Sequence, residues 1–270
     1  MAADSSPEFQ AFMSELRRPA KYARLSLSLV QRIGADEFSR QPSTAQALKA
    51  ARTRLHQLTG AYLPDHINYA HFSDIFSSIP AEDENAFRAA AQNMMRLHAS
   101  TAERLPILDH FFRDCLAEIA PVNSVLDLAC GLNPLAIPWM PLADHFTYSA
   151  CDAVIPLVDF LNDFFKTRQI NGQAVECDLS STVPAQPAQL ALLLKTLPLL
   201  DQIDPTLAPH LLASLPADHI LVSYPLRSLG GKGKGMYQTY TQRFTNLAAN
   251  LGRRFRTFEF RGEIAFLLSR

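Results

Sequence analysis

Apolar and polar positions follow two different patterns along the chain, and the change falls near residue 124. Before it, apolar side chains recur at helical spacing, as at Phe9, Phe12, Met13 and Leu16, and we find no convincing strand. After it, short continuous apolar runs alternate with helical segments. Runs of this kind are typical of a parallel α/β sheet that is covered on both faces.

The second pattern predicts a sheet with a distinct end. Five apolar runs are expected to be parallel strands: Ser124 to Leu128, Thr147 to Cys151, Gln173 to Cys177, Leu190 to Leu194 and Ile220 to Tyr224. A helix is expected from Met236 to Asn250, with a stop near Gly252. The runs Phe255 to Phe260 and Ile264 to Leu268 predict an antiparallel hairpin that closes one edge of the sheet.

We therefore expect an α/β fold, a Rossmann-like domain over residues 91–270, preceded by a helical extension over residues 1–90. The first helix of that extension should be amphipathic with a basic flank, and a second helical run is expected from Ser43 to Leu58. No stretch approaches the roughly 18 apolar residues of a membrane span, so we expect a soluble, cytoplasmic protein without membrane contact.

The charge pattern gives the two ends of the chain a candidate role. The formal net charge is -1, but residues 1–56 carry nine Lys and Arg against five Asp and Glu. Residues 57–225 carry seven against nineteen, and residues 226–270 carry nine against two. Two basic ends suit a polyanion, because local potential steers phosphate backbones; ordinary solvated surface is the alternative. The candidate cations are Arg17, Arg18, Lys21, Arg24, Lys49, Arg52, Arg54, Lys232 and Lys234.

The cysteines and histidines do not predict a metal site or disulfides. Four cysteines, at positions 115, 130, 151 and 177, form no C-x-x-C pair, so we expect reduced thiols. His66 and His71 have no third His or Cys near them, which favours a loop or core role for both.

An apolar strand runs into a tight turn in the segment VLDLACGLNP, residues 125–134, which contains Asp127 and Gly131. In doubly wound folds, ligands bind at the carboxyl ends of strands, and a glycine there lets the backbone approach them. The G-x-G-x-x-G fingerprint is absent, which disfavours a nicotinamide cofactor. Asp152 and Asp178 end the next two strands and could accept hydrogen bonds from ribose hydroxyls and an adenine amino group. Helix capping or turn formation is the alternative for each acid.

A glycine-rich segment, Ser228 to Gly235, contains four glycines and two lysines. We expect a mobile cationic loop and not a P-loop, since no Ser or Thr follows either lysine. Near it, Tyr224, Tyr237 and Tyr240 could stack on a base, although packing in the core or at its rim is the more common role of such residues.

The amino-acid sequences of four segments resemble those of a known family, the aminoglycoside-resistance 16S rRNA (guanine-1405 N7) methyltransferases. These are class I enzymes dependent on S-adenosylmethionine. The segments are HASTAER (98–104), LDLACGLNP (126–134), LLLKTLP (192–198) and SYPLRSLGGKGKGM (223–236). The resemblance implies S-adenosylmethionine as cofactor and 16S rRNA in the 30S subunit as partner. It makes the basic extension and the lysine-rich loop RNA contacts.

The resemblance also implies roles for individual residues. Arg104 would pair with the methionine carboxylate, for which a planar guanidinium is well suited; an ion pair with Glu103 or Asp109 is the alternative. The other implied cofactor contacts are hydroxyls from Ser100 and Thr101, Gly131 under the methionine, Asp152 on the ribose, Asp178 with Leu179 around the adenine, and Leu194 covering the ring. The hydroxyls could instead cap a helix, and Leu194 could belong to the core.

Guanine N7 carries a lone pair and no proton, so methyl transfer to it needs alignment rather than a general base. Glu263, beside the terminal hairpin, is our candidate to accept hydrogen bonds from guanine N1–H and N2–H₂, with a surface turn as the alternative. Lys195 could contact a phosphate or the target nucleotide, unless it snorkels from the core edge. Two rival functions remain. One is methylation of another rRNA base or of a small molecule, and the other is non-catalytic binding.

Overall fold

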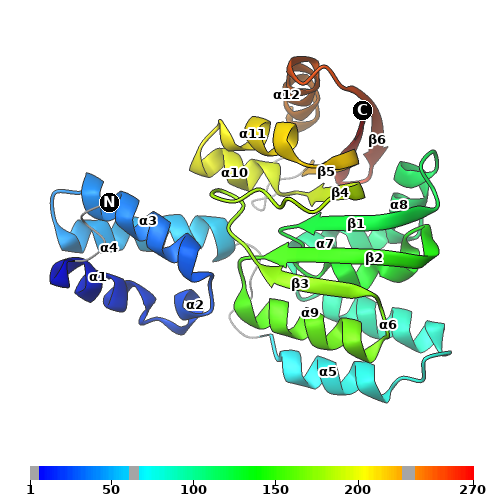
Figure 1. Ribbon diagram of the computed structural model, residues 1–270, viewed down its shortest axis with the longest axis horizontal. Helices are drawn as coiled ribbons and strands as arrows, with labels where there is room; N and C mark the ends of the chain where they lie inside the picture. Colours follow the sequence, from blue (N-terminus) through cyan, green and yellow to red (C-terminus); the bar gives the residue numbers. More distant parts are fainter. Residues whose placement is uncertain (1–5, 61–66, 227–234) are drawn as a thin grey trace.

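The structure of the protein is a computed structural model that describes residues 6–60, 67–226 and 235–270. It forms a seven-stranded sheet in the order β3-β2-β1-β4-β5-β7-β6, with helices on both sides (Figure 1). The strands are β1 (Val122–Leu128), β2 (Leu142–Asp152), β3 (Gly172–Glu176), β4 (Ala188–Leu194), β5 (Ala217–Pro225), β6 (Arg254–Phe260) and β7 (Glu263–Ser269). Lys232 and Lys234, and with them the predicted cationic loop, lie outside the described residues, as does His66.

The strand directions agree with the prediction from the sequence. Strands β1 to β5 are parallel to their neighbours, while β7 runs antiparallel to both β5 and β6. The hairpin of β6 and β7 therefore closes one edge of the sheet. Sheets of this kind collect ligands at the carboxyl ends of their parallel strands, which all face one side of the molecule.

Both faces of the sheet are buried at the central strands β1, β4, β5 and β7, which explains the continuous apolar runs there. On one face, residues such as Val125 and Leu192 share a core with α8 and α9; on the other, Leu126 and Leu193 pack with α10, α11 and α12. The helices of this domain are α7 (Ala99–Arg104), α8 (Leu108–Leu116), α9 (Ile155–Thr167), α10 (Leu197–Ile203), α11 (Leu207–Ser214) and α12 (Met236–Asn250). Short 3₁₀ turns cover Leu105–Ile107 and Asn133–Trp139.

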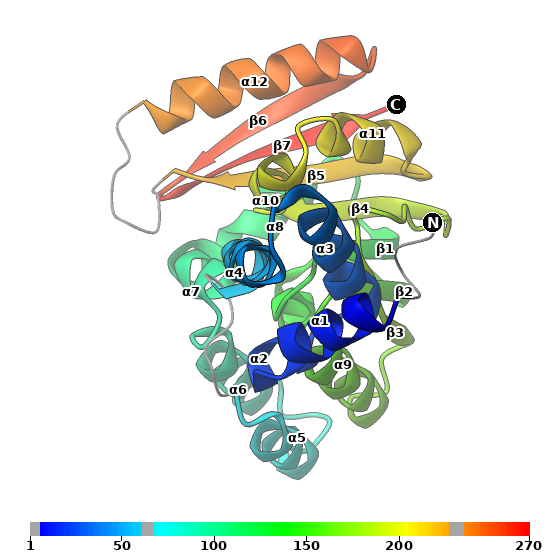
Figure 2. The ribbon, with the colours of Figure 1, turned by 90° about the vertical axis from the view of Figure 1, so that its left-hand side faces the viewer.

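Helices α1 to α4 form a compact group beside the carboxyl edge of the sheet (Figures 1 and 2). They are α1 (Pro7–Arg17), α2 (Ala20–Ala23), α3 (Leu27–Arg40) and α4 (Thr44–Leu55), which continues as a π turn, His56–Gly60. The rings of Phe9 and Phe12 on α1 pack against Phe38 on α3, with centroids 5.3 and 5.1 Å apart. The amphipathic pattern that predicted the first helix thus provides the core of this group.

Helices α5 (Tyr69–Ser78) and α6 (Glu84–Met95) lie apart from that group, against α9 of the sheet domain (Figure 1). Phe76 on α5 meets Phe164 on α9 edge to face, with centroids 5.3 Å apart, and Phe87 on α6 stacks on the same ring at 5.9 Å. These contacts tie residues 69–95, on both sides of the predicted boundary at residue 90, to the sheet domain.

The extension joins the sheet domain through backbone contacts as well. Leu25 and Val154 form an isolated antiparallel bridge, the N–H of Ser26 donates to the carbonyl of Ala153 over 2.7 Å, and that of Ile155 donates to the carbonyl of Arg24 over 2.9 Å. These contacts fix the start of α3 directly beside the end of β2. Among the described residues, no helix has the length and apolar character needed to cross a membrane.

Candidate cofactor site

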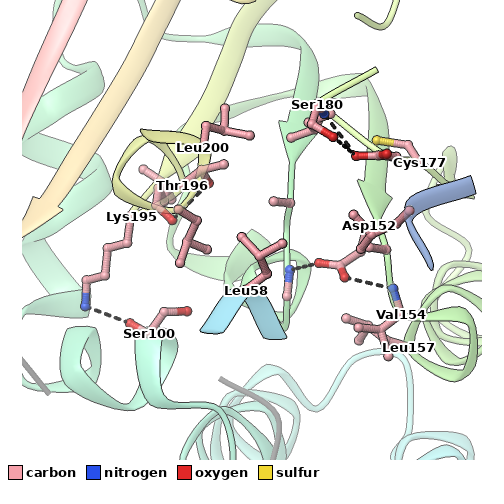
Figure 3. Close-up of a pocket in the computed structure, with 18 of the residues that line it drawn as sticks. Leu58, Ser100, Asp152, Val154, Leu157, Cys177, Ser180, Lys195, Thr196 and Leu200 are labelled. Carbon is pink, nitrogen blue, oxygen red and sulfur yellow. Dashed lines mark hydrogen bonds between the residues drawn. The ribbon is translucent and has the colours of Figure 1, made fainter. Parts of the chain in front are cut away.

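A pocket of about 900 Å³, open solvent included, lies at the carboxyl ends of β1 to β4 (Figure 3). The predicted residues that line it are Ser100, Gly131, Asp152, Asp178, Leu179, Leu194 and Lys195. The fold therefore brings together, at one edge of the sheet, side chains that lie far apart in the sequence.

Asp152 ends β2, and its carboxylate is held by the backbone. Its Oδ2 accepts from the N–H of Gly131 over 2.9 Å and its Oδ1 from that of Val154 over 3.1 Å (Figure 3). Burial raises the pKa of Asp152, while the backbone N–H groups of Gly131, Val154 and Ala153 act in the opposite direction. The carboxylate is thus oriented before any ligand arrives, and each oxygen keeps a second lone pair for a ligand hydroxyl.

Gly131 lies at a position that favours glycine. Its φ is +52°, and a Cβ built there would lie 2.9 Å from Cε1 of His98. Both the backbone conformation and the His98 ring therefore disfavour a side chain. Burial lowers the pKa of His98 to about 4, helped by the charges of Lys195 and Arg104, so its ring is neutral at neutral pH. His98 begins the HASTAER segment, and the sequence did not single it out as a pocket residue.

Asp178 lies just beyond β3 and is almost completely buried. Its Oδ2 accepts from Nε of Arg32 over 2.9 Å, and its Oδ1 accepts from both the N–H and the hydroxyl of Ser180. Arg32 belongs to α3 of the extension, a contact that the sequence gave no means of predicting. Leu29 and Leu58, also from the extension, line the same pocket.

Lys195 follows β4 in a conformation that is rare outside glycine, with φ of +61°. Strained backbone of this kind costs of order 1–3 kcal/mol and is concentrated at functional sites. Its side chain is only 2% exposed, and Nζ lies 3.1 Å from the carbonyl of Ser100 and 2.6 Å from Oε2 of Glu103. The snorkelling alternative is wrong, since the ammonium group is buried rather than in water.

Arg104 and Glu263 form a buried ion pair behind the pocket and do not line it. Oε1 of Glu263 accepts from Nε and NH2 of Arg104 over 3.1 and 2.7 Å, and Oε2 lies 3.4 Å from Nζ of Lys195. Burial opposes ionisation of Glu263, but the charges of Arg104 and Lys195 outweigh it and lower the pKa of the carboxyl. The surface-turn alternative for Glu263 is wrong, because Glu263 is only 1% exposed.

Arg104, Thr101 and Glu263 are each bonded to other residues of the protein. Arg104 pairs with neither Glu103 nor Asp109 in the structure, and its remaining amino group, NH1, donates to Oδ1 of Asn133 over 3.2 Å. Thr101 is buried, and its hydroxyl donates to the carbonyls of Met95 and His98. Contact of Arg104 with a methionine carboxylate, of Thr101 with the cofactor, or of Glu263 with a guanine stays a prediction.

Asn133 extends this buried network to β1. Its Nδ2 donates to Oδ2 of Asp127 over 2.9 Å, and the hydroxyl of Tyr148 donates to the same oxygen over 2.7 Å. Burial raises the pKa of Asp127 to about 7, against the effect of these two hydrogen bonds and of the Arg104 charge. Asn133 therefore links the acid of the VLDLACGLNP segment to Arg104, a role that its sequence position did not reveal.

The candidate RNA-binding cations of the extension divide by environment. Arg18, Lys21, Arg24 and Lys49 are exposed and Arg17 is half-buried. Arg52 and Arg54 are instead engaged within the extension: Arg52 donates to Glu15, and Arg54 donates to Asp36 and Glu37 over 2.8 and 2.9 Å. Near the other end, Tyr224 is buried and stacks on Tyr240 with centroids 4.6 Å apart, which is the packing role.

Comparison with known proteins decides the family. The model of the family described as ribosomal RNA methyltransferase (FmrO) matches residues 18–266. The chain belongs to this family of ribosomal RNA methyltransferases. A 16S rRNA (guanine(1405)-N(7))-methyltransferase of Frankia casuarinae is 35% identical over 257 residues, which cover 94% of this chain and 90% of that protein. One of Serratia marcescens is 36% identical over 83% of each chain.

Solved structures agree with this assignment. The 16S rRNA methyltransferase RmtF in complex with S-adenosyl-L-homocysteine superposes with a TM-score of 0.84 at 32% identity, covering 98% of this chain and 99% of that one. The 16S rRNA methylase RmtB superposes with a TM-score of 0.81 at 28% identity, over 97% of this chain and 98% of that one. The resemblance and the class I methyltransferase fold expected from the sequence are confirmed.

The residues of the pocket fit a nucleoside with a charged tail. Two carboxylates at successive strand ends provide acceptors for hydroxyl and amino groups, and apolar side chains from α3, α9 and β4, among them Leu29, Leu157 and Leu194, provide flat surface for a ring. Gly131 lines the pocket without a side chain, and the His98 ring packs against the position that a Cβ would take. These features fit the hydrogen-bonding groups and the apolar ring faces of the nucleoside in S-adenosylmethionine.

Proposed function

We propose that this family member transfers a methyl group from S-adenosylmethionine to N7 of guanine 1405 of 16S rRNA, within the 30S subunit in the cytoplasm, and thereby gives aminoglycoside resistance. The observation that carries the proposal is the pocket in which Asp152, Gly131 and Asp178 meet at the ends of successive strands. The names of the relatives with 35% and 36% identity support the nucleotide and the atom.

When bound, S-adenosylmethionine supplies an electrophilic methyl group on a sulfonium. The target N7 has no proton to lose, so the protein has to align the two atoms and exclude competing geometries. Asp152, preoriented by two backbone N–H groups, holds the ribose hydroxyls, and Asp178 accepts from the adenine amino group. No residue is required to act as a base.

Lys195 and Glu263 are the two candidate contacts to the target nucleotide, and Nζ of Lys195 lies 3.4 Å from Oε2 of Glu263. Lys195 lines the pocket and has its ammonium group held by Ser100 and Glu103, so it is our candidate to contact the target nucleotide. Glu263, which balances the charges of Lys195 and Arg104, is our candidate to accept from the guanine if its pairing is exchanged on RNA binding. The exposed cations of the extension provide the grip on rRNA phosphates.

The test uses intact 30S subunits, purified protein and S-adenosylmethionine labelled on its methyl group. The modified nucleotide is mapped by chemical cleavage specific for 7-methylguanine. We expect cleavage at guanine 1405 alone, together with loss of aminoglycoside binding to the treated subunits. An Asp152→Ala variant serves as the matched control and should give no label at limiting cofactor.

Label without that cleavage would move the target to another rRNA base and would contradict the proposed atom. Absence of label on subunits and on naked RNA would contradict the rRNA substrate. It would then favour a small-molecule methyltransferase or a non-catalytic relative.

A further inference from the structure

The extension supplies part of the wall of the cofactor pocket. Leu29 on α3 and Leu58 in the π turn after α4 line the pocket together with residues of the sheet domain. In Figure 3, Leu58 lies between Ser100 and Asp152. Because these two side chains complete the pocket wall, cofactor binding should depend on the position of the extension relative to the sheet domain.

The extension also makes a polar contact with a residue of the pocket. Nε of Arg32, on α3, donates to Oδ2 of Asp178 over 2.9 Å, and the two side chains are 28% and 4% exposed. The other carboxylate oxygen accepts from Ser180, which follows in the same turn. No other ion pair of Asp178 occurs among the described residues. The Asp178 carboxylate is therefore held at one oxygen by Arg32 of α3 and at the other by Ser180.

The backbone of the same segment is anchored to the neighbouring strand end. The bridge between Leu25 and Val154, and the hydrogen bond from Ser26 to Ala153, place α3 directly after Asp152. The start of α3 is thus tied to the end of β2, while Arg32, further along the same helix, contacts Asp178 just beyond the end of β3. One helix of the extension spans the two acids that we assign to the ribose and the adenine.

We propose that Arg32 is a positioning residue of the cofactor site, which holds the Asp178 carboxylate in the orientation that accepts from the adenine amino group. This inference rests on the proposed function, because it assumes that the nucleoside lies between Asp152 and Asp178. It also makes the extension an integral part of cofactor recognition, in addition to any contact that it makes with RNA.

The experiment measures binding of S-adenosylhomocysteine to the full chain by calorimetry. Because a hydrogen bond between charged groups is lost, Arg32→Ala should weaken binding by about 10-fold. Arg32→Lys keeps the charge but loses the planar geometry, so its affinity should lie between those of Arg32→Ala and the wild type. The matched control is Arg40→Ala on the same helix, whose side chain is 62% exposed and pairs with Asp36. It should bind like the wild type.

A double-mutant cycle isolates the pair. In an Asp178→Asn background, Arg32→Ala should have much less effect than in the wild type, because the partner of the guanidinium has already lost its charge. Kinetics on 30S subunits provide a readout that a merely structural role would not move. Arg32→Ala should raise KM for S-adenosylmethionine while kcat at saturating cofactor stays close to the wild-type value, as expected for uniform binding lost far from the reacting atoms.

Equal binding by Arg32→Ala and Arg40→Ala would overturn the inference, and so would an equal effect of Arg32→Ala in the wild type and in Asp178→Asn. A fall in kcat without change in KM would also contradict it, since this would indicate a smaller folded fraction. The calorimetric cycle needs no RNA. The inference can therefore fail while methylation at guanine 1405 holds, or hold while the methylation target proves to be different.

Discussion

Glu263 is the acidic member of a buried cluster that contains two cations, Arg104 and Lys195. All three side chains are at most 2% exposed. Glu263→Gln would keep the shape of the side chain but leave both cations buried with less compensation. Because removing one member of a buried ion pair costs about 3–5 kcal/mol, we expect a loss of this order in the free energy of unfolding, measured by urea denaturation.

The control for this variant is Glu259→Gln, on the exposed side of the neighbouring strand β6. A surface carboxylate contributes little, so this change should alter stability by less than about 0.5 kcal/mol. If Glu263→Gln were as mild as Glu259→Gln, the ion pair seen between Glu263 and Arg104 would not be the state present in solution.

Asp127 makes the free energy of unfolding depend on pH. Burial raises its pKa to about 7 in the folded chain, against 3.8 for an ordinary aspartate. The folded state therefore keeps a proton that the unfolded state loses, so the contribution is fully present below about pH 4 and is lost as the pH rises through about 7. The free energy of unfolding of the wild type, relative to Asp127→Asn, should fall over this window when measured by urea unfolding.

The comparison with Asp127→Asn cancels the contribution of His98 to the pH dependence of stability. That contribution has the opposite sign to that of Asp127 and is present in both proteins. The pKa of His98 is lowered to about 4, so its contribution is lost as the pH falls from about 6.5. Asp144→Asn, at an exposed carboxyl, provides the matched control. A difference between wild type and Asp127→Asn that stays constant from pH 4 to pH 7 would show that Asp127 is ionised throughout.

At the scale of single residues, the sequence identified the acids at strand ends and Gly131, because their positions follow from the strand pattern. It did not identify the partners of those residues. Arg32 lies 146 positions from Asp178, and Arg104 lies 159 positions from Glu263. Only the folded chain decides which side chains meet over such separations, and burial then decides their charge.

At the scale of elements, the turn after β1 combines backbone strain with close packing. Gly131→Ala should destabilise the turn by about 1–3 kcal/mol, from the positive φ and from contact between the new methyl group and His98. It should also weaken binding of S-adenosylhomocysteine, because the methyl group would displace the ring of His98, which lines the pocket. Thermal unfolding and calorimetry on the same samples measure the two effects.

His98→Ala in the Gly131→Ala background separates the causes. It removes the contact and leaves the backbone cost, so it should restore part of the stability that Gly131→Ala alone loses relative to the His98→Ala parent. A neutral effect of Gly131→Ala on both measurements would contradict the conformation of the turn. An equal loss with and without the His98 ring would assign the whole cost to the backbone.

Most elements could be predicted because their local pattern is unambiguous. The five apolar runs, the helix from Met236 to Asn250 and the terminal hairpin all occur as expected, since strands covered on both faces must be apolar throughout. The placement of α5 and α6 could not be read in this way. Their aromatic side chains indicate a buried face but do not specify α9 as its partner.

At the scale of the whole molecule, the charges of the extension divide into surface cations and structural ion pairs. Lys49 is exposed, whereas the side chain of Arg54 is 18% exposed and pairs with Asp36 and Glu37. Lys49→Ala should lower the slope of log affinity for 30S subunits against log salt by up to about 1, with unchanged stability. Arg54→Ala should instead lower the stability of the extension.

Filter binding over a salt series and thermal unfolding separate the two outcomes. Arg40→Ala, at another exposed cation of the extension, tests whether any lost surface charge has the same effect as Lys49. Equal slopes for Lys49→Ala and the wild type would remove Lys49 from the RNA contacts. A changed slope in Arg54→Ala with unchanged stability would show that its ion pairs are not structural.

The sequence by itself determined the sheet, the terminal hairpin, the helical start and the positions of the acids at the strand ends, because each follows from local periodicity and from the geometry of parallel strands. The tertiary structure decided that Glu263 is buried against Arg104, that Lys195 is enclosed, and that Arg32 on α3 contacts Asp178 of the cofactor pocket. These outcomes depend on contacts between segments far apart in the chain, whose free energy no local pattern encodes.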